Sequence, residues 1–153
     1  MEKNTDYSII SQIIATFASQ LHIGVDMNRI EIEGYKSLKK IDIPLNPINI
    51  LIGSNGSGKS NFLSFFEMLN HIYERKFSPY VALNGGTARF LHKGLKVTDS
   101  IKAKATFNRN TYGFELKEGE NQFVFMHEWL GYTSKAGGIM TEQTFLPIRM
   151  KQR

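Results

Sequence analysis

The sequence lacks cysteine, which excludes a disulfide scaffold, a thiolate zinc site and a cysteine nucleophile. Its four histidines do not have the spacing of metal ligands. No run of about 20 apolar residues is present, so the sequence contains no candidate transmembrane helix. A strong charge excess is also absent, because 19 Lys and Arg against 14 Asp and Glu give a net charge of only +5. A net charge of this size is compatible with nucleic-acid binding but does not indicate it.

The remaining composition is that of an ordinary globular protein, with 41% hydrophobic and 22% charged residues. A chain of 153 residues typically forms one domain and buries a core without covalent cross-links.

The longest uncharged stretch, residues 7–21, carries apolar side chains at helical spacing on an otherwise polar segment. These side chains are Ile10, Ile13, Ile14, Phe17 and Leu21. The stretch lacks the positive flank of an export signal and the basic cluster of a membrane-surface helix. We therefore expect residues 1–26 to be a helical N-terminal extension that packs on the rest of a cytoplasmic protein, with no membrane contact.

Period-two alternation of apolar and polar residues predicts strands over residues 29–33 and 40–45, joined by a turn at 34–37. Residues 48–52 form a mostly apolar run, which is typical of a strand buried on both faces. A glycine-rich loop follows over residues 53–58, and apolar residues at helical spacing predict a helix over 59–73.

The second half of the sequence predicts a β meander within residues 95–130, preceded by an irregular segment over 79–86. The predicted strands are 101–107, 112–116 and 123–129, with turns at 108–110 and 118–121. A flexible loop is expected over residues 131–138.

Residues Gly53 to Ser60 match the pattern G-x-x-x-x-G-K-[ST] in full, between a predicted strand and a predicted helix. Glycines let such a loop wrap closely around phosphates, and its N–H groups converge on the anion at the positive end of the helix dipole. Lys59 is expected to reach the β- and γ-phosphates, and the Ser60 hydroxyl to ligate Mg²⁺. The other loop residues expected at the nucleotide are Ser54, Asn55, Gly56, Ser57, Gly58 and Asn61.

Residues 30–69 resemble the opening of the ATPase heads of the ABC superfamily. The similarity is to the chromosome-maintenance heads, the RecF-type recombination ATPases and the related AAA-family ATPases of genome maintenance and phage defence. It is carried by Gly34-Tyr35-Lys36-Ser37-Leu38, by residues 50–60 and by Asn61, since this branch typically ends its loop G-K-S-N. Weaker resemblance extends through Gly85-Gly86, residues 89–94 and the meander, so that it covers about residues 27–129.

The resemblance implies that Lys36 and Ser37 lie near the nucleotide, while the residues alone also fit a solvated turn. In this family a protein often begins at a position like Met27, which makes residues 1–26 an extension or an upstream start. Basic residues that could follow a nucleic-acid backbone are Lys36, Lys39, Lys40, Lys102 and Lys104. The modest net charge favours a solvated strand face instead.

Hydrolysis needs an acidic residue after an apolar strand, and no segment supplies it clearly. In the best candidate, residues 123–128, His127 stands where an aspartate is needed, and we read the segment as a meander strand. Glu128 is a weak candidate base. Residues 83–87 mimic the family's signature loop but come too soon after Lys59, and we read them as a turn. Gln143 has no local support as the lid glutamine.

We therefore expect an α/β phosphate-loop (P-loop) NTPase fold, an ABC-ATPase-like first lobe over residues 27–153 with an antiparallel β subdomain, and we expect this fold to be incomplete. The predicted function is binding of ATP and Mg²⁺ through the Walker A loop in DNA repair, genome maintenance or phage defence. Hydrolysis would require a second lobe, from a partner or a homodimer, because Walker B and signature motifs are absent.

The alternative is a non-enzymatic nucleotide-binding regulatory module or a truncated ATPase fragment. A small kinase or GTPase is disfavoured by the lack of an N-K-x-D motif, and a transporter subunit by Asn61.

Overall fold

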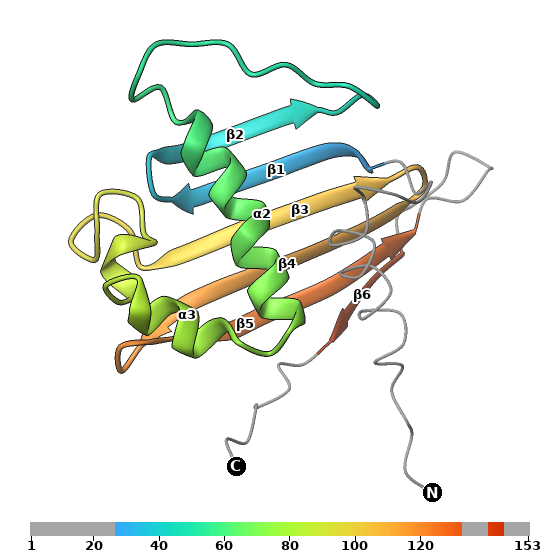
Figure 1. The fold of residues 1–153 in the computed structure, drawn as a ribbon. Helices are drawn as coiled ribbons and strands as arrows, with labels where there is room; N and C mark the ends of the chain where they lie inside the picture. Colours follow the sequence, from blue (N-terminus) through green and yellow to red (C-terminus); the bar gives the residue numbers. More distant parts are fainter. Residues whose placement is uncertain (1–26, 133–140, 146–153) are drawn as a thin grey trace, which may run out of the picture.

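The computed structural model describes residues 27–132 and 141–145, and these form a six-stranded sheet with two helices (Figure 1). The strands are β1 (Met27–Tyr35), β2 (Leu38–Pro44), β3 (Ser100–Phe107), β4 (Asn110–Gly119), β5 (Gln122–Tyr132) and β6 (Thr141–Phe145). The helices are α2 (Lys59–Tyr73) and α3 (Phe77–Leu83), followed by a single 3₁₀ turn at Thr87–Arg89. Every neighbouring pair of strands is antiparallel, in the order β2-β1-β3-β4-β5-β6.

The β1–β2 hairpin confirms the two strands predicted from alternation. Ile30 and Ile32 are buried and lie opposite Ile43 and Ile41. Glu31 lies opposite Asp42 in the row between them, and Glu33 lies opposite Lys40 in the next row. One face of the hairpin therefore joins the core and the other carries charge, as a period of two requires.

The meander is confirmed, with each predicted strand present and extended by one to three residues at one end or at both. Ala103 and Ala105 of β3 lie opposite Phe114 and Tyr112 of β4, and all four side chains are buried. Strand β5 continues through Tyr132, so residues 131 and 132 are strand and not the loop that glycine content predicts. The remainder of that predicted loop lies outside the described residues.

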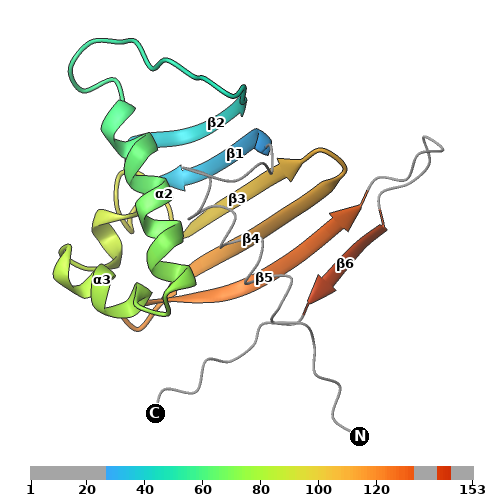
Figure 2. The same ribbon diagram turned by 45° about the vertical axis from the view of Figure 1, so that its right-hand side comes forward.

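Helix α2 crosses one face of the sheet, with its first turn near β2 and its last turn near β5 (Figures 1 and 2). It confirms the predicted helix, and four of its side chains are buried against the sheet: Phe62, Phe65, Met68 and Leu69. The Phe65 ring meets the buried Tyr35 ring of β1 edge-on, with 5.3 Å between centroids. These contacts fix α2, and with it the preceding glycine-rich loop, on the β1–β2 hairpin.

Helix α3 corrects the expectation of an irregular segment over residues 79–86. Pro79 is the third residue of this helix, where the backbone N–H has no intrahelical acceptor, so proline is tolerated there. Phe77 anchors the helix by stacking on Phe123 of β5 with 5.7 Å between ring centroids. Only the residues after Leu83, including Gly85 and Gly86 at positive φ, are irregular as predicted.

The apolar run 48–52 is not a buried strand, which contradicts the prediction made from its composition. Ile48, Ile50 and Ile52 are 83%, 79% and 90% exposed, and no strand of the described chain pairs with them. The run lies beyond edge strand β2, in the long connection that leads to α2 (Figure 2). A strand is buried on both faces only when it has neighbours in the sheet, and the described residues supply none at this edge.

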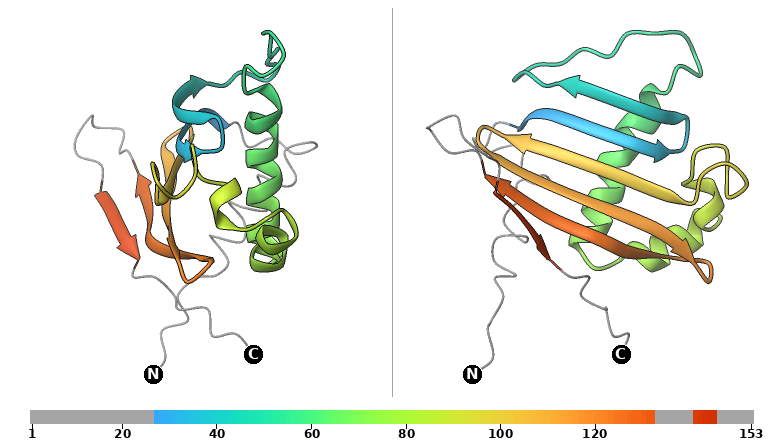
Figure 3. Two further views of the ribbon diagram at one scale, coloured as in Figure 1. Left: turned by 90° about the vertical axis from the view of Figure 1, so that its left-hand side faces the viewer. Right: turned by 180° about the vertical axis from the view of Figure 1, so that it is seen from behind.

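Both helices lie on one face of the sheet, which leaves the other face open (Figure 3). Charged pairs lie on this open face, including Lys40–Glu33, Lys102–Glu115 and Lys104–Glu31. One apolar contact lies on it, because Trp129 of β5 lies directly opposite Gly113 of β4. A Cβ atom on Gly113 would stand only 2.1 Å from the Trp129 ring. Glycine is therefore required at this position for the indole to lie flat against the neighbouring strand.

Residues 1–26, for which a helix is expected, lie outside the described residues. Gln143 is part of β6, which pairs with β5 through its backbone. Within residues 27–132 and 141–145, no helix is long and apolar enough to cross a membrane.

Candidate functional site

The glycine-rich loop turns tightly into the first residue of α2. Gly56 and Gly58 have φ angles of +85° and +99°, which side-chain-bearing residues rarely adopt. A Cβ atom on Gly58 would lie 3.0 Å from the Ser37 hydroxyl oxygen and 3.2 Å from Leu38 Cδ2. Gly58 is therefore needed both for the turn and for the close approach of the loop to the hairpin.

The Lys59 ammonium is held inside this loop. Its Nζ donates hydrogen bonds to the carbonyl oxygens of Gly53 and Ser54, at 2.6 and 2.7 Å, and lies 3.2 Å from the Ser57 hydroxyl oxygen. The Ser57 N–H in turn donates to the Ser54 carbonyl at 3.2 Å. The positive charge therefore sits within a ring of loop oxygens at the N-terminus of α2.

The β1–β2 turn lies against the first two turns of α2. The Asn61 amide donates a hydrogen bond of 2.8 Å to the Ser37 hydroxyl, and Lys36 Nζ donates one of 3.0 Å to the Ser64 hydroxyl. The Tyr35 hydroxyl donates to the Ser64 carbonyl at 3.0 Å. The structure thus brings Ser37 to the C-terminal end of the glycine-rich loop and Lys36 to the second turn of α2.

Burial lowers the pKa of Lys36, and Glu67 opposes this shift through its negative charge. The ammonium lies 5.2 Å from the ring centroids of both Tyr35 and Phe90, at a distance where cation–π attraction operates. Aromatic rings and the Ser64 hydroxyl therefore hold this cation beside α2.

Sequence reasoning missed Ser64, Phe90 and His92, which complete this arrangement. The Lys36 N–H donates to the Phe90 carbonyl at 2.8 Å, and the His92 N–H donates to the Gly34 carbonyl at 2.9 Å. His92 Nδ1 lies 2.8 Å from the Lys36 carbonyl oxygen, so Nδ1 carries the proton of that bond. Ser64 could have been predicted, because it follows Ser60 by one turn on the same face of the predicted helix. No pattern in the nearby sequence indicates that residues 90 and 92 contact the hairpin.

The acidic candidate Glu128 is not near the loop. It lies in the interior of β5, which β1, β3 and β4 separate from β2. Its carboxylate accepts a 2.6 Å hydrogen bond from the buried Tyr112 hydroxyl, and His127 lies 3.2 Å from Glu115. Residues 123–128 are an antiparallel meander strand, as predicted. Of residues 83–87, only 84–86 form the predicted turn, because Leu83 ends α3 and Thr87 begins the 3₁₀ turn.

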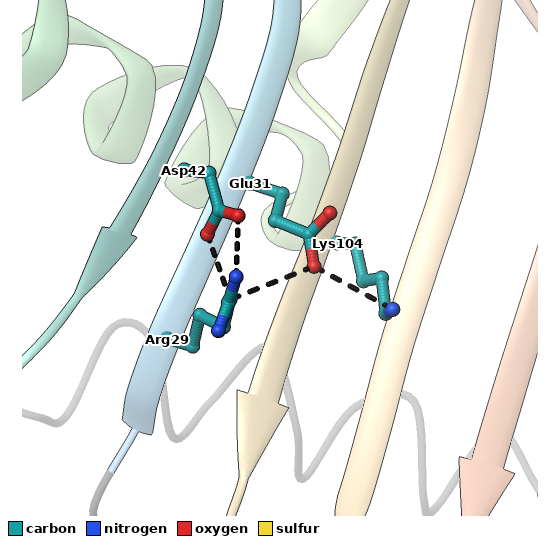
Figure 4. A network of polar contacts seen from close by, with 4 residues as sticks. All are labelled: Arg29, Glu31, Asp42 and Lys104. Carbon is teal, nitrogen blue, oxygen red and sulfur yellow. Dashed lines mark hydrogen bonds and ion pairs between the residues drawn. The ribbon is translucent and has the colours of Figure 1, made fainter.

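Most of the lysines considered for nucleic-acid contact are paired with acids on the open face of the sheet. Lys40, Lys102 and Lys104 lie 3.3, 3.4 and 3.5 Å from the carboxylates of Glu33, Glu115 and Glu31 respectively. Figure 4 shows the Lys104–Glu31 pair continuing through Arg29 to Asp42. The Arg29 guanidinium holds the pKa of Asp42 below its usual range through a hydrogen bond and its charge. This face therefore carries paired positive and negative side chains and is not a uniformly basic surface.

A ready-made protein metal centre is absent from the part of the chain that the structure describes, where no three metal-ligating side chains cluster. The exposed Ser60 hydroxyl at the start of α2 suits Mg²⁺ instead, because Mg²⁺ takes few protein ligands and completes its shell with water and phosphate oxygens.

Comparison with protein families gave a match over the site. A family model described as "AAA ATPase domain" matches residues 26–123, which is more than half of the chain. The matched region contains the glycine-rich loop and every residue described above as touching it. Searches of the curated proteins and of the solved structures returned no match.

Proposed function

Because the chain belongs to the family of AAA ATPase domains, we propose that it binds MgATP through residues 53–60. The observation that carries this proposal is the position of Lys59, whose ammonium is already inside the loop at the N-terminus of α2. The Gly53 and Ser54 carbonyls that hold it are the partners that phosphate oxygens would replace. A phosphate is a charged acceptor and makes the stronger hydrogen bond.

The backbone N–H groups of Ser54, Asn55, Gly56, Ser57 and Gly58 are proposed to surround the β-phosphate, with those of Ser60 and Asn61 at the helix N-terminus. Lys36 and Ser37 are proposed to border the nucleotide from the hairpin side. Ser60 would hold Mg²⁺, whose charge would neutralise the β- and γ-phosphate oxygens when bound. The tight approach of Gly58 to Ser37 and Leu38 supports this arrangement, because it fixes the loop against the hairpin.

We further propose that this lobe works as the chromosome-maintenance and RecF-type heads do, with hydrolysis depending on a second lobe. Support comes from the G-K-S-N ending of the loop and from the Gly-Tyr-Lys-Ser turn beside it. The biological role that follows from this proposal is in DNA repair, genome maintenance or phage defence.

The proposal is tested by replacing Lys59 with alanine and measuring MgATP affinity by titration calorimetry. We expect at least about a tenfold loss, because hydrogen bonds to charged groups typically contribute 1.5–3 kcal/mol. Lys76→Ala is the matched control, since Lys76 is an exposed lysine that pairs with Glu74 beyond the end of α2. Equal affinities of the native protein and the Lys59→Ala protein would contradict the site.

Phosphate release by the isolated chain separates the ATPase proposal from a second candidate, a nucleotide-binding module that performs no hydrolysis. Glu128 lies in a meander strand away from β2, and its carboxylate accepts a hydrogen bond from Tyr112. The one acidic candidate is therefore far from the loop, which favours little or no ATP hydrolysis by this chain alone. We therefore expect MgATP binding with turnover at the background rate. Turnover that disappears in Lys59→Ala would show that the chain contains a complete catalytic site.

A further inference from the structure

A cavity lies beside the β1–β2 hairpin, at the end where β1 meets the start of β3. Its volume is about 240 Å³. One glutamate and three lysines border it: Glu33, Lys39, Lys93 and Lys102. His92, Thr98 and Ser100 complete its polar wall. None of residues 53–61 borders this cavity, so it is separate from the glycine-rich loop.

The charges around this cavity leave positive charge unbalanced. Glu33 is paired with Lys40 at 3.3 Å, and Lys102 is paired with Glu115 at 3.4 Å. Lys39 and Lys93 have no ion-pair partner among the residues that the structure describes, although both border the cavity. Two ammonium groups therefore remain to attract an anion, and Lys102 adds a third that is shared with Glu115.

The walls of the cavity are rigid where they meet the hairpin. A Cβ atom on Gly34 would lie 2.3 Å from the Ser100 carbonyl oxygen, so the two strands approach as closely as a glycine allows. His92 is 9% exposed, and its backbone N–H and its Nδ1 are bonded to the Gly34 and Lys36 carbonyls. The ring is thereby fixed as a rigid part of the wall, and its remaining polar atom, Nε2, is a hydrogen-bond acceptor in this tautomer.

We propose that this cavity binds a phosphate group, held mainly by Lys39 and Lys93. Three lysines and the two hydroxyl-bearing residues Thr98 and Ser100 form a donor set suited to a compact oxyanion. The group can come from a free phosphate-containing molecule or from the backbone of a nucleic acid, since both present the same oxygens. The proposal does not depend on nucleotide binding at the glycine-rich loop.

The test is a titration of the full chain with inorganic phosphate, followed by the amide resonances of Thr98 and Ser100. Gly56 and Gly58 report the glycine-rich loop separately in the same spectra. We expect saturable shifts at Thr98 and Ser100 in the native protein and in Lys59→Ala. Shifts confined to Gly56 and Gly58, or shifts at Thr98 that Lys59→Ala abolishes, would overturn the proposal.

The double variant Lys39→Gln/Lys93→Gln is expected to weaken phosphate binding about tenfold or more, because it removes two charged donors. The control is Lys76→Gln/Lys96→Gln, which removes the same charge at two exposed lysines that do not border the cavity. Unchanged dispersion of the other amides shows that both variants are folded. Equal dissociation constants in the two double variants would contradict the site.

A parallel titration with a short single-stranded oligonucleotide distinguishes the two sources. If nucleic acid supplies the phosphate, the amide shifts of Thr98 and Ser100 saturate at a lower phosphate concentration with the oligonucleotide than with the free ion. The affinity for the oligonucleotide then falls steeply as the salt concentration rises. If a small molecule supplies it, the oligonucleotide leaves these amides unshifted while inorganic phosphate shifts them. Either result supports a phosphate site, and a failure of both ligands to shift them refutes it.

Discussion

At the scale of single residues, the Tyr112–Glu128 pair joins two strands of the meander through a partly buried hydrogen bond. Tyr112 is buried in β4 and donates its 2.6 Å hydrogen bond to a carboxylate on the next strand. We expect Tyr112→Phe to lower the free energy of unfolding by about 1–2 kcal/mol, because the partly buried Glu128 loses its donor. Urea denaturation measures this, with the exposed Tyr73→Phe as a control that should change little.

The same pair gives a dependence on alkaline pH. Burial, and then the negative charge of Glu128, raise the pKa of Tyr112 well above 10.0, and burial also raises that of Tyr35. Stabilisation from a raised tyrosine pKa is complete below the unfolded value of about 10 and is lost as pH rises toward the folded value. Stability should therefore fall above pH ~10 in the native protein and fall less steeply in Tyr112→Phe. Parallel pH profiles for the two proteins would contradict this assignment.

At the scale of elements, the β1–β2 hairpin is the unit that joins the sheet to the glycine-rich loop. Gly34 has a φ of +80°, and a side chain there would collide with the Ser100 carbonyl. We expect Gly34→Ala to destabilise the protein by about 2 kcal/mol or more, through backbone strain and this clash. Gly119→Ala is the matched control, because its Cβ would meet no atom within 4 Å. Equal urea midpoints for the two variants would show that the hairpin is not held as described.

The elements also show what alternation and spacing in the sequence can predict. They predicted β1 to β5 and α2 because each of these elements buries one side of a regular pattern, as Ile30 and Ile32 do in β1. They failed for residues 48–52, since an apolar run carries no information about whether neighbouring strands are present to cover it. They failed to predict α3 because Pro79 was taken to exclude a helix. Proline disrupts the interior of a helix but is tolerated in the first turn, where Pro79 lies.

At the scale of the whole molecule, the exposed run 48–52 leaves three isoleucines in contact with solvent beside an edge strand. Clustered apolar side chains at a sheet edge favour association with another chain. We expect the native protein to self-associate as its concentration rises, and Ile50→Lys/Ile52→Lys to remain monomeric in light-scattering measurements. Leu83→Lys tests specificity, since Leu83 is 88% exposed but lies apart from the run, on α3. Association that survives in Ile50→Lys/Ile52→Lys would place the contact elsewhere.

The site itself was predictable only where its residues are close in sequence. Lys59 and Ser60 follow from the spacing of the loop, and Lys36 and Ser37 were reached through resemblance alone. The contact of His92 with the Lys36 carbonyl spans 56 positions and depends on how the segment after α3 returns to the hairpin. The cavity beside Gly34 likewise exists only because β1, β3 and the segment after α3 converge in three dimensions.

The close contact of Trp129 with Gly113 also provides an intrinsic optical reporter. The chain contains one tryptophan, and its ring lies against β4 on the face of the sheet opposite the helices. Its emission should therefore follow the pairing of β4 with β5 and be insensitive to events at the glycine-rich loop. Every substitution discussed above can then be checked for an intact sheet by fluorescence, without a label, before its effect on binding is interpreted.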